Sequence, residues 1–298
     1  MAKRHLAKRT IKYLGLFLGL SVVIVALVSS YFGTRGRQIK FSDRPSQPYQ
    51  EVSFPSLAHD RVTLEGWYFP SGATGPEAKA SQTAVIVHGW AGHRGRWLDL
   101  AQYLQRSGLN VLTFDLRGGS GRNTYGQRES GDLAGAVDWL KTEKKVDPAT
   151  LNVLGSSMGA LAVIGYAKDH QLGKLALFGP VIDLNTVKKR VLKDRYIFWP
   201  ALYAASATWV EKIFFGVRAV NPIAIFDAID EQTLIIHAVD DELSEVSAIR
   251  RLESEANDRG QTNLQIIYVP SGDHTFLDVD PVNGFPYSQK IVEFINGN

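Results

Sequence analysis

Short apolar runs alternate with amphipathic stretches along most of the chain, and this alternation limits the possible folds more than any other feature. A continuous apolar run is typical of a strand buried on both faces, and strands that alternate with helices form parallel sheets with helices on both sides. The sequence therefore predicts an α/β fold around a mostly parallel, eight-stranded sheet, in which the first two strands form a hairpin. The expected strands are 49–55, 62–70, 84–89, 110–115, 151–155, 174–179, 232–238 and 264–270, and the expected helices are 96–107, 128–144, 158–169, 244–258 and 286–296.

One segment, at about 185–220, interrupts this alternation. It separates two predicted strands by more residues than a simple crossover needs, so we expect an inserted helical cap. Its rings either line an apolar pocket for an acyl or alkyl group or bury the cap against the sheet, and its basic start faces either lipid head groups or water. The basic residues are Lys188, Lys189, Arg190, Lys193 and Arg195, and the aromatic residues are Tyr196, Phe198, Trp199, Tyr203, Trp209, Phe214 and Phe215.

The N-terminal region contains 19 consecutive uncharged residues, Leu14 to Phe32, with basic residues on both sides. As a helix this run would span roughly 28 Å, close to the ~30 Å thickness of the hydrocarbon layer. We expect a basic tail at 1–13, a transmembrane anchor at 14–32 and a linker at 33–48. Five basic residues before the run and four after it slightly favour a cytoplasmic N-terminus with the remainder outside. A cleaved signal peptide, which would release a secreted protein, and a buried core helix are the alternatives.

Charge and cysteine content exclude several classes of function. The net charge is +3, and nine of the 33 Lys and Arg residues lie within the first 44 positions. The rest of the chain is mildly acidic, which argues against a general nucleic-acid surface. The chain contains no cysteine, and this excludes disulfides, thiolate metal sites and a cysteine nucleophile.

The motif Gly155-x-Ser157-x-Gly159 lies where a buried strand is expected to end and a helix to begin. A nucleophile on such a tight turn takes a strained backbone, and side chains two positions away on either side would collide with the turn. Both of those positions are glycine around Ser157, whereas Ser156 has Leu154 and Met158 there. Ser157 is therefore the candidate nucleophile, on a turn that the helix N-terminus faces with free N–H groups.

A serine nucleophile needs a base, and the base needs an acid that orients it. His88 and His237 end predicted strands at the same sheet edge as Ser157, and His274 lies in a loop directly after the last strand. Asp240, Asp241 and Glu242 follow the preceding strand. Serine, acid and histidine then occur in the order expected for a nucleophile carried on such a strand-to-helix turn.

These motifs together resemble the α/β-hydrolase superfamily, especially membrane-anchored, serine-hydrolase-like members related to the BEM46 group and to the S9 and S33 peptidase-like esterases. The resemblance covers roughly residues 50–296. It implies an α/β-hydrolase fold at 49–298 with its cap inserted at about 185–220. The motifs that carry it are VIVHGWAGH, FDLRGGSGR, GSSMG, HAVDDE and GDHTF.

The resemblance also implies roles for individual residues. Asp241, four positions after the strand-ending His237, would be the acid, and His274 would be the base. The backbone N–H groups of Trp90 and Met158 would form the oxyanion hole. The histidine of the HG pair, His88, is structural in the family and takes no proton-transfer role here.

The predicted function is that of a serine hydrolase that cleaves carboxylic ester or thioester bonds through an acyl-enzyme. Neither a metal nor an organic cofactor is needed for this chemistry. The expected substrate is a small-molecule or lipid-like ester, and the expected partner of the N-terminal helix is a membrane. A peptidase or amidase of the same fold is one alternative, and a non-catalytic, membrane-tethered binding domain is another.

Overall fold

The computed structural model describes residues 2–35, 41–42, 44–72, 82–119, 122–194, 200–272, 274 and 286–297. The chain forms two compact units. The smaller unit consists of Met1–Arg35 and Leu184–Arg218, and the larger unit consists of Gly36–Asp183 and Ala219–Asn298. Four residues that the sequence assigned to the cap, Arg195, Tyr196, Phe198 and Trp199, lie outside the described residues.

The larger unit is built on one eight-stranded sheet with the order β1-β2-β4-β3-β5-β6-β7-β8. The strands β1 and β2 form an antiparallel hairpin, β2 pairs antiparallel with β4, and the other neighbours are parallel. This arrangement confirms the predicted mostly parallel sheet. The strands are β1 (Gln50–Pro55), β2 (Thr63–Phe69), β3 (Thr83–Val87), β4 (Asn110–Phe114), β5 (Asn152–Ser156), β6 (Leu175–Phe178), β7 (Thr233–Ala238) and β8 (Leu264–Val269).

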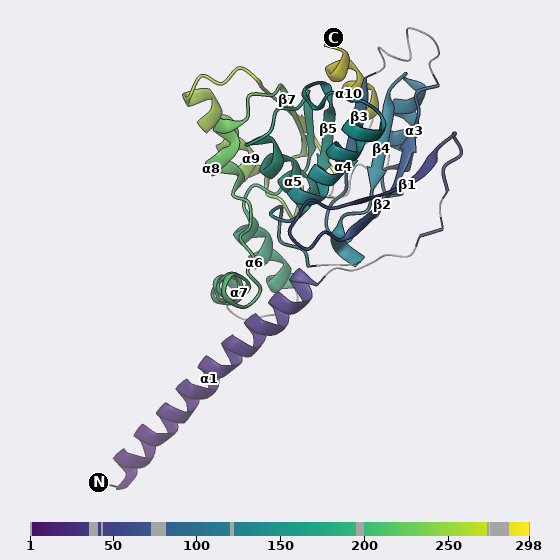
Figure 1. Ribbon diagram of the computed structural model, residues 1–298. Coiled ribbons are helices and arrows are strands. Elements are labelled where there is room, and N and C mark those ends of the chain that lie inside the picture. The colour runs from purple at the N-terminus through teal and green to yellow at the C-terminus, as the bar shows by residue number, and fades with distance from the viewer. Residues whose placement is uncertain are drawn as a thin grey trace. The chain divides into compact units, whose positions relative to one another are not determined.

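Helices cover both faces of this sheet (Figure 1). Helices α4 (Glu129–Glu143), α5 (Met158–Ala167) and α9 (Val246–Asp258) contribute to one core cluster. Helices α3 (Leu98–Arg106) and α10 (Tyr287–Asn296) contribute to a second cluster on the other face. The short elements are η1 (Arg117–Gly119), η2 (Pro148–Thr150), α8 (Pro222–Ile225) and η3 (Phe226–Ala228).

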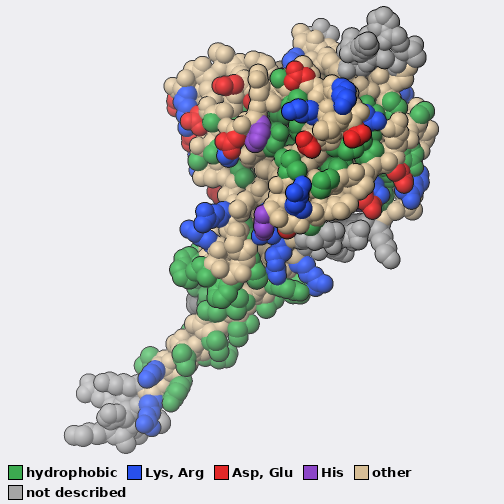
Figure 2. All heavy atoms as spheres, in the orientation of Figure 1, with side chains coloured by type: hydrophobic (Ala, Val, Ile, Leu, Met, Phe, Trp, Pro, Cys, Tyr) green, Lys and Arg blue, Asp and Glu red, His purple; other side chains and the backbone are tan. Residues whose placement is uncertain are grey.

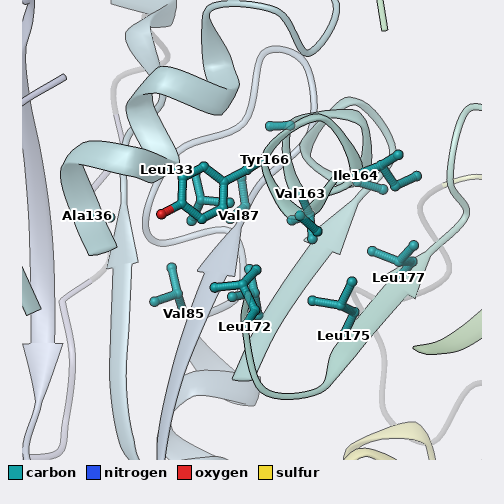
Figure 3. Packing of buried hydrophobic residues seen from close by; sticks show 14 of the residues in the cluster. Val85, Val87, Leu133, Ala136, Val163, Ile164, Tyr166, Leu172, Leu175 and Leu177 are labelled. Atoms are coloured by element: carbon teal, nitrogen blue, oxygen red, sulfur yellow. The ribbon is translucent and has the colours of Figure 1, made fainter. Parts of the chain in front are cut away.

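The alternation of side chains along β3 explains why four of its five residues, 84–87, form a continuous apolar run. Val85 and Val87 face the cluster that α4 and α5 cover, and Ala84 and Ile86 face the other. Figure 3 shows Val85 and Val87 beside side chains of the two covering helices. A strand buried on both faces favours apolar side chains at nearly every position, so such strands read as near-continuous apolar runs.

Part of the segment that precedes β1 is held against the larger unit. The ring of Phe41 stacks on His93 with centroids 4.0 Å apart and meets the Trp67 ring edge-on. The Ser46 hydroxyl and backbone N–H both donate to the side-chain oxygen of Gln102, at 2.6 and 2.8 Å. The chain is therefore attached to the sheet before the first strand begins.

The smaller unit consists of three helices, α1 (Ala2–Thr34), α6 (Leu184–Asp194) and α7 (Pro200–Phe214). The insertion predicted at about 185–220 is thus helical, and α7 packs against both other helices. Ala26 and Ser30 of α1 and Ala204 and Ala207 of α7 are buried, and the Ser30 hydroxyl donates to the carbonyl of Ala207 at 3.1 Å. Small residues at such positions let two helices approach closely.

Within α1, the segment Arg9–Thr34 is long and apolar enough to cross a membrane. It has 26 residues, a mean hydropathy of 2.4 and a most apolar window that is only 6% buried. Among the described residues it is the one helix with this length and composition. A membrane anchor and a signal sequence both have these properties.

Candidate active site

Ser157 lies on the sharp turn that joins β5 to α5. Its backbone has φ 51° and ψ −116°, a region that costs a non-glycine residue about 1–3 kcal/mol. The Ser157 N–H donates to the carbonyl of Phe178 at 2.9 Å, which ties the turn to β6. This strained turn places the serine hydroxyl at the carboxyl edge of the parallel strands.

Close packing explains the two glycines that flank this serine. A Cβ at position 159 would lie 2.3 Å from the carbonyl oxygen of Val87, and a Cβ at position 155 would lie 2.9 Å from the Cα of Ala160. Both contacts are shorter than real Cβ atoms make, and both involve backbone that cannot move aside. Close backbone contacts at positions 155 and 159 therefore explain why Ser157, with glycine two positions away on either side, can occupy the turn.

The side chains of Ser157, His274 and Asp241 form a hydrogen-bonded chain. His274 Nε2 lies 2.7 Å from Ser157 Oγ, and His274 Nδ1 lies 2.7 Å from Asp241 Oδ2. An ionised carboxylate only accepts, so Nδ1–H donates to Asp241 and Nε2 is left to accept from the serine hydroxyl. The structure thus brings together three residues that lie up to 117 positions apart in the chain.

Asp241 is held in one orientation by backbone N–H groups. Its Oδ1 accepts from the N–H groups of Leu243 and Ser244, each at 2.8 Å. Burial pushes the pKa of the Asp241 carboxyl upward, but hydrogen bonding and charge interaction with His274 together with these N–H groups outweigh burial and lower the pKa below its usual value. The carboxylate therefore remains ionised and stabilises a protonated imidazole.

Two residues near the acid take part in positioning although the sequence argument gave them no role. Asp240 accepts from the Gly272 N–H at 2.7 Å and so ties the acid loop to the segment that carries His274. The Ser244 hydroxyl donates to the carbonyl of Pro180 at 2.7 Å. The short acceptor-rich run Asp240–Glu242 was the available signal, because aspartate readily caps nearby backbone N–H groups.

Gly179 leaves room for the acid and the histidine. It has φ +45°, and a Cβ there would lie 3.5 Å from Asp241 Oδ2 and 3.6 Å from His274 Nδ1. A side chain at this position would require a left-handed backbone and would extend beside the hydrogen bond between the two catalytic candidates. Glycine is therefore favoured by the backbone conformation, and a Cβ would make ordinary van der Waals contact with the pair.

The turn after β3 passes directly beside the serine. A Cβ at Gly89 would lie 3.1 Å from Ser157 Cβ, and the turn closes through a hydrogen bond from the Gly92 N–H to the Gly89 carbonyl at 3.1 Å. Trp90, within this turn, has a half-exposed side chain. Met158 begins α5, where the first N–H groups have no partner within the helix. The turn that contains Trp90 thus passes beside the serine, and Met158 follows the serine directly in the chain.

Neither of the other two strand-ending histidines occupies the position of His274. The buried His88 accepts at Nε2 from the Leu116 N–H at 3.0 Å, so its Nδ1–H donates to the Gly89 carbonyl at 2.7 Å. His237 is fully buried on β7, opposite Tyr268 of β8. Burial lowers the pKa of both imidazoles, so each is neutral near pH 7.

Comparison with known proteins places this chain in a family. A family model described as "Serine aminopeptidase, S33" matches residues 78–219. A Mycobacterium tuberculosis protein, Rv2307c, is 32% identical over 200 residues, which are 59% of this chain and 69% of the relative. The residues matched by the family model include the strand-to-helix turn with Ser157.

Solved structures with the same fold include an esterase and a peptidase. The Pyrococcus furiosus esterase Pf2001 has a TM-score of 0.68 and 23% identity, with 89% of this chain and 97% of that chain covered. A puromycin-hydrolyzing peptidase of Mycobacterium tuberculosis has a TM-score of 0.65 and 13% identity, with 84% of this chain and 40% of that chain covered. The eight-stranded sheet, the family model and the relative agree: this chain belongs to the α/β-hydrolase superfamily.

Proposed function

We propose that the chain is a serine hydrolase that cleaves carboxylic ester bonds, thioesters included, through an acyl-enzyme intermediate. The observation that carries this proposal is the hydrogen-bonded chain Ser157–His274–Asp241, with both contacts at 2.7 Å. A serine hydroxyl is a weak nucleophile unless a base can accept its proton, and the base works best when an acid holds it in the correct tautomer. In this proposal the three side chains supply the nucleophile, the base and the acid.

In the proposed acylation step, Ser157 Oγ attacks the carbonyl carbon of the ester while His274 Nε2 takes the hydroxyl proton. The negative charge moves to the carbonyl oxygen, where the N–H groups of Trp90 and Met158 stabilise it, each by about 3–4 kcal/mol. Asp241 stabilises the protonated imidazole. The carbon–oxygen bond to the leaving group then breaks, and the leaving alkoxide takes the proton from His274 and departs as an alcohol.

Deacylation repeats these roles with water as the nucleophile. His274 Nε2 takes a proton from the water as its oxygen attacks the acyl carbon, and the same oxyanion hole holds the second tetrahedral intermediate. The bond to Ser157 Oγ then breaks, Oγ recovers its proton from His274, and the carboxylic acid is released. The acid, base and nucleophile end in their starting protonation states.

Ester cleavage is favoured over peptide cleavage by the extent of the structural likeness. The Pyrococcus esterase is covered almost completely by this chain, whereas 40% of the puromycin-hydrolyzing peptidase is covered. The peptidase or amidase alternative has its own support, because the matching family model is described as an aminopeptidase. Both reactions use the same triad and differ in the leaving group.

We also propose that α1 is a retained membrane anchor, with its basic N-terminal tail in the cytoplasm and the larger unit on the other side. The support is the packing of α7 on α1, including the hydrogen bond from Ser30 to Ala207. Signal cleavage that removed α1 would expose the buried small face of α7 to water. Protease protection of intact cells tests the orientation, and N-terminal sequencing of the mature protein tests retention.

A fluorophosphonate probe tests the nucleophile, because it reacts with an activated serine. The wild type and the matched control Ser156→Ala should both be labelled, and Ser157→Ala should not. Labelling of Ser157→Ala would refute the proposal by showing that another residue is the reactive nucleophile. No labelling of a folded wild type would refute it and favour a non-catalytic domain. A series of p-nitrophenyl esters with increasing acyl length, measured beside aminoacyl p-nitroanilides, then separates esterase from peptidase by kcat/KM.

A further inference from the structure

Helix α7 has two faces of different character. One face is buried within the smaller unit and carries Ala204, Ala207 and Glu211. On the opposite face, Leu202, Trp209 and Ile213 follow the spacing i, i+7 and i+11, which brings them onto one stripe. Their side chains are 47%, 69% and 51% exposed. A helix that faces water normally presents polar side chains on its outer face. We therefore expect this apolar stripe to contact something other than water.

The position of α7 on α1 indicates the depth at which this stripe would lie. Ser30 of α1 donates to Ala207 near the middle of α7, and the first basic residue after the apolar run is Arg35. Arg35 follows Ser30 by five positions, which corresponds to about 7–8 Å along a helix axis. If α1 spans the bilayer, α7 therefore lies at the boundary between acyl chains and head groups, where amphipathic helices bind.

The apolar surface of α7 continues that of α1. Figure 2 shows apolar side chains gathered along α1 and over the neighbouring α7, and in Figure 1 the axis of α7 runs across α1 rather than along it. A helix that crosses a membrane-spanning helix in this way lies in the plane of the membrane. Tryptophan prefers this depth because its ring has an apolar body and a polar N–H.

The charges of the smaller unit complement an anionic lipid surface. Lys189 and Lys193 on α6 and Lys212 on α7 are exposed. Glu211, the acidic side chain that the structure describes within this unit, is buried and forms an ion pair with Lys188. The exposed charges described here are therefore basic, and basic residues beside an apolar face favour anionic head groups.

We infer that α7 is a membrane-interface helix, whose stripe of Leu202, Trp209 and Ile213 inserts into the lipid surface beside the end of α1. The partner is the bilayer itself, with the basic residues of α6 over anionic head groups. This inference rests on the proposed anchor and is independent of the catalytic roles. It assigns the insertion a membrane contact in addition to its packing on α1.

The absence of cysteine from the chain allows a direct test with single-cysteine variants of the full-length protein. Leu202→Cys, Trp209→Cys and Ile213→Cys place a fluorescent label on the stripe. Ser247→Cys, at an exposed position of α9 in the larger unit, is the aqueous control, and Val23→Cys, at a half-exposed position of α1, is the control for the bilayer interior. Each labelled protein is reconstituted in vesicles of about three parts phosphatidylcholine to one part phosphatidylglycerol, doped with nitroxide lipids.

The inference predicts that lipid nitroxides quench the labels at 202, 209 and 213 about threefold more than the label at 247. A nitroxide near the head groups should quench these three positions more than a nitroxide at the bilayer centre, and position 23 should show the reverse order. Replacing phosphatidylglycerol by phosphatidylcholine should reduce quenching on α7 and leave position 23 unchanged.

Other outcomes separate this inference from the proposals on which it depends. If the label at position 23 is quenched but the three α7 labels are quenched no more than the label at position 247, the inference is overturned and the anchor remains supported. Absence of quenching at 23 would refute the anchor and the inference together. A second copy of the chain would be the partner if the α7 labels are not quenched by lipid and unlabelled Trp209→Cys chains form disulfide cross-links with one another. That result would overturn the lipid contact. Hydrolysis of a soluble p-nitrophenyl ester by the same samples reports on the catalytic proposal separately.

Discussion

A charged side chain is buried beside Ser157, whereas apolar side chains are exposed on the outer face of α7. Beside the serine, the Asp241 side chain is fully covered and has three hydrogen-bond partners. On α7, the large apolar side chain of Trp209 is 69% exposed. The first region holds a buried and fully paired carboxylate, and the second exposes a large apolar side chain, which suits a surrounding that is not water.

The two regions also differ in what holds the backbone in place. The turn at Ser157 keeps an unfavourable φ because β6, the turn after β3 and the two glycine contacts constrain it from several sides. The helices α1 and α7 have regular backbones that meet through small side chains. Substitutions should therefore be costly near the serine and mild between the helices.

The largest effect is expected at the nucleophile. Ser157→Ala removes the attacking oxygen and should lower kcat for ester hydrolysis by about 10⁵–10⁶-fold, while the circular dichroism spectrum stays that of the wild type. The matched control Ser156→Ala should keep kcat within a few-fold of wild type. Steady-state kinetics with a p-nitrophenyl ester measures both. Equal losses in the two variants would remove the distinction between the adjacent serines.

The second largest effect is expected at the acid, where substitution should lower kcat by about 10⁴-fold. Asp241→Asn keeps the shape of the side chain but cannot hold the imidazole in the tautomer that accepts from serine, so kcat should fall by roughly 10⁴-fold. Asp240→Asn should cause a much smaller loss, because Asp240 accepts from the Gly272 N–H and does not contact the imidazole through any hydrogen bond described here. If Asp240→Asn is the more damaging of the two, the acid has been assigned to the wrong residue.

The lowered pKa of Asp241 predicts a pH dependence of stability. A carboxyl whose pKa is lower in the folded than in the unfolded protein adds stability above its unfolded pKa, about 3.9, and loses it as pH falls through the folded value. The free energy of unfolding of the wild type should therefore fall more steeply below about pH 4 than that of Asp241→Asn. Urea unfolding in a mild detergent at several pH values measures this. Parallel curves would contradict the lowered pKa.

A pair of glycine substitutions tests the difference in packing between the two regions. Gly159→Ala brings a methyl group against the backbone oxygen of Val87, where 2.3 Å is available, and should destabilise the protein by about 1–3 kcal/mol or more. Gly15→Ala on α1, with no atom within 4 Å of the new methyl group, should be neutral or favour the helix by up to about 1 kcal/mol. Thermal unfolding of both variants gives the comparison. A tolerated Gly159→Ala would mean that the turn is less constrained than its contacts indicate.

The smallest effect is expected between the helices of the smaller unit. Ser30→Ala removes the hydrogen bond to Ala207 and should weaken the packing of α7 on α1 by about 0.6 kcal/mol. Ser29→Ala is the matched control, because the Ser29 hydroxyl donates to Ala26 within its own helix. Hydrogen exchange of the α7 backbone amides should become faster in Ser30→Ala only. Equal exchange in both variants would argue that the packing does not depend on this bond.

The parts of the site that could be predicted from sequence depend on neighbours a few residues apart. The choice of Ser157 over Ser156 needed only the residues two positions away, because the steric demand of a tight turn is local. The strands could be placed for a similar reason, since burial on both faces leaves a continuous apolar run, as in β3. The choice of Asp241 over Asp240 came from the resemblance to a family and not from spacing.

The remaining features depend on segments that meet only after folding. Asp240 accepts from the Gly272 N–H, 32 positions away. The Ser244 hydroxyl donates to the Pro180 carbonyl, 64 positions away, and the Ser30 hydroxyl donates to the Ala207 carbonyl, 177 positions away. Periodicity reports which face of a segment is buried but not which distant segment covers it, because that choice depends on matching shapes and on hydrogen-bond partners brought together by the whole chain. The apolar run of α1 was therefore evident from composition alone, whereas its pairing with α7, and the outward direction of the α7 stripe, emerged from the folded chain.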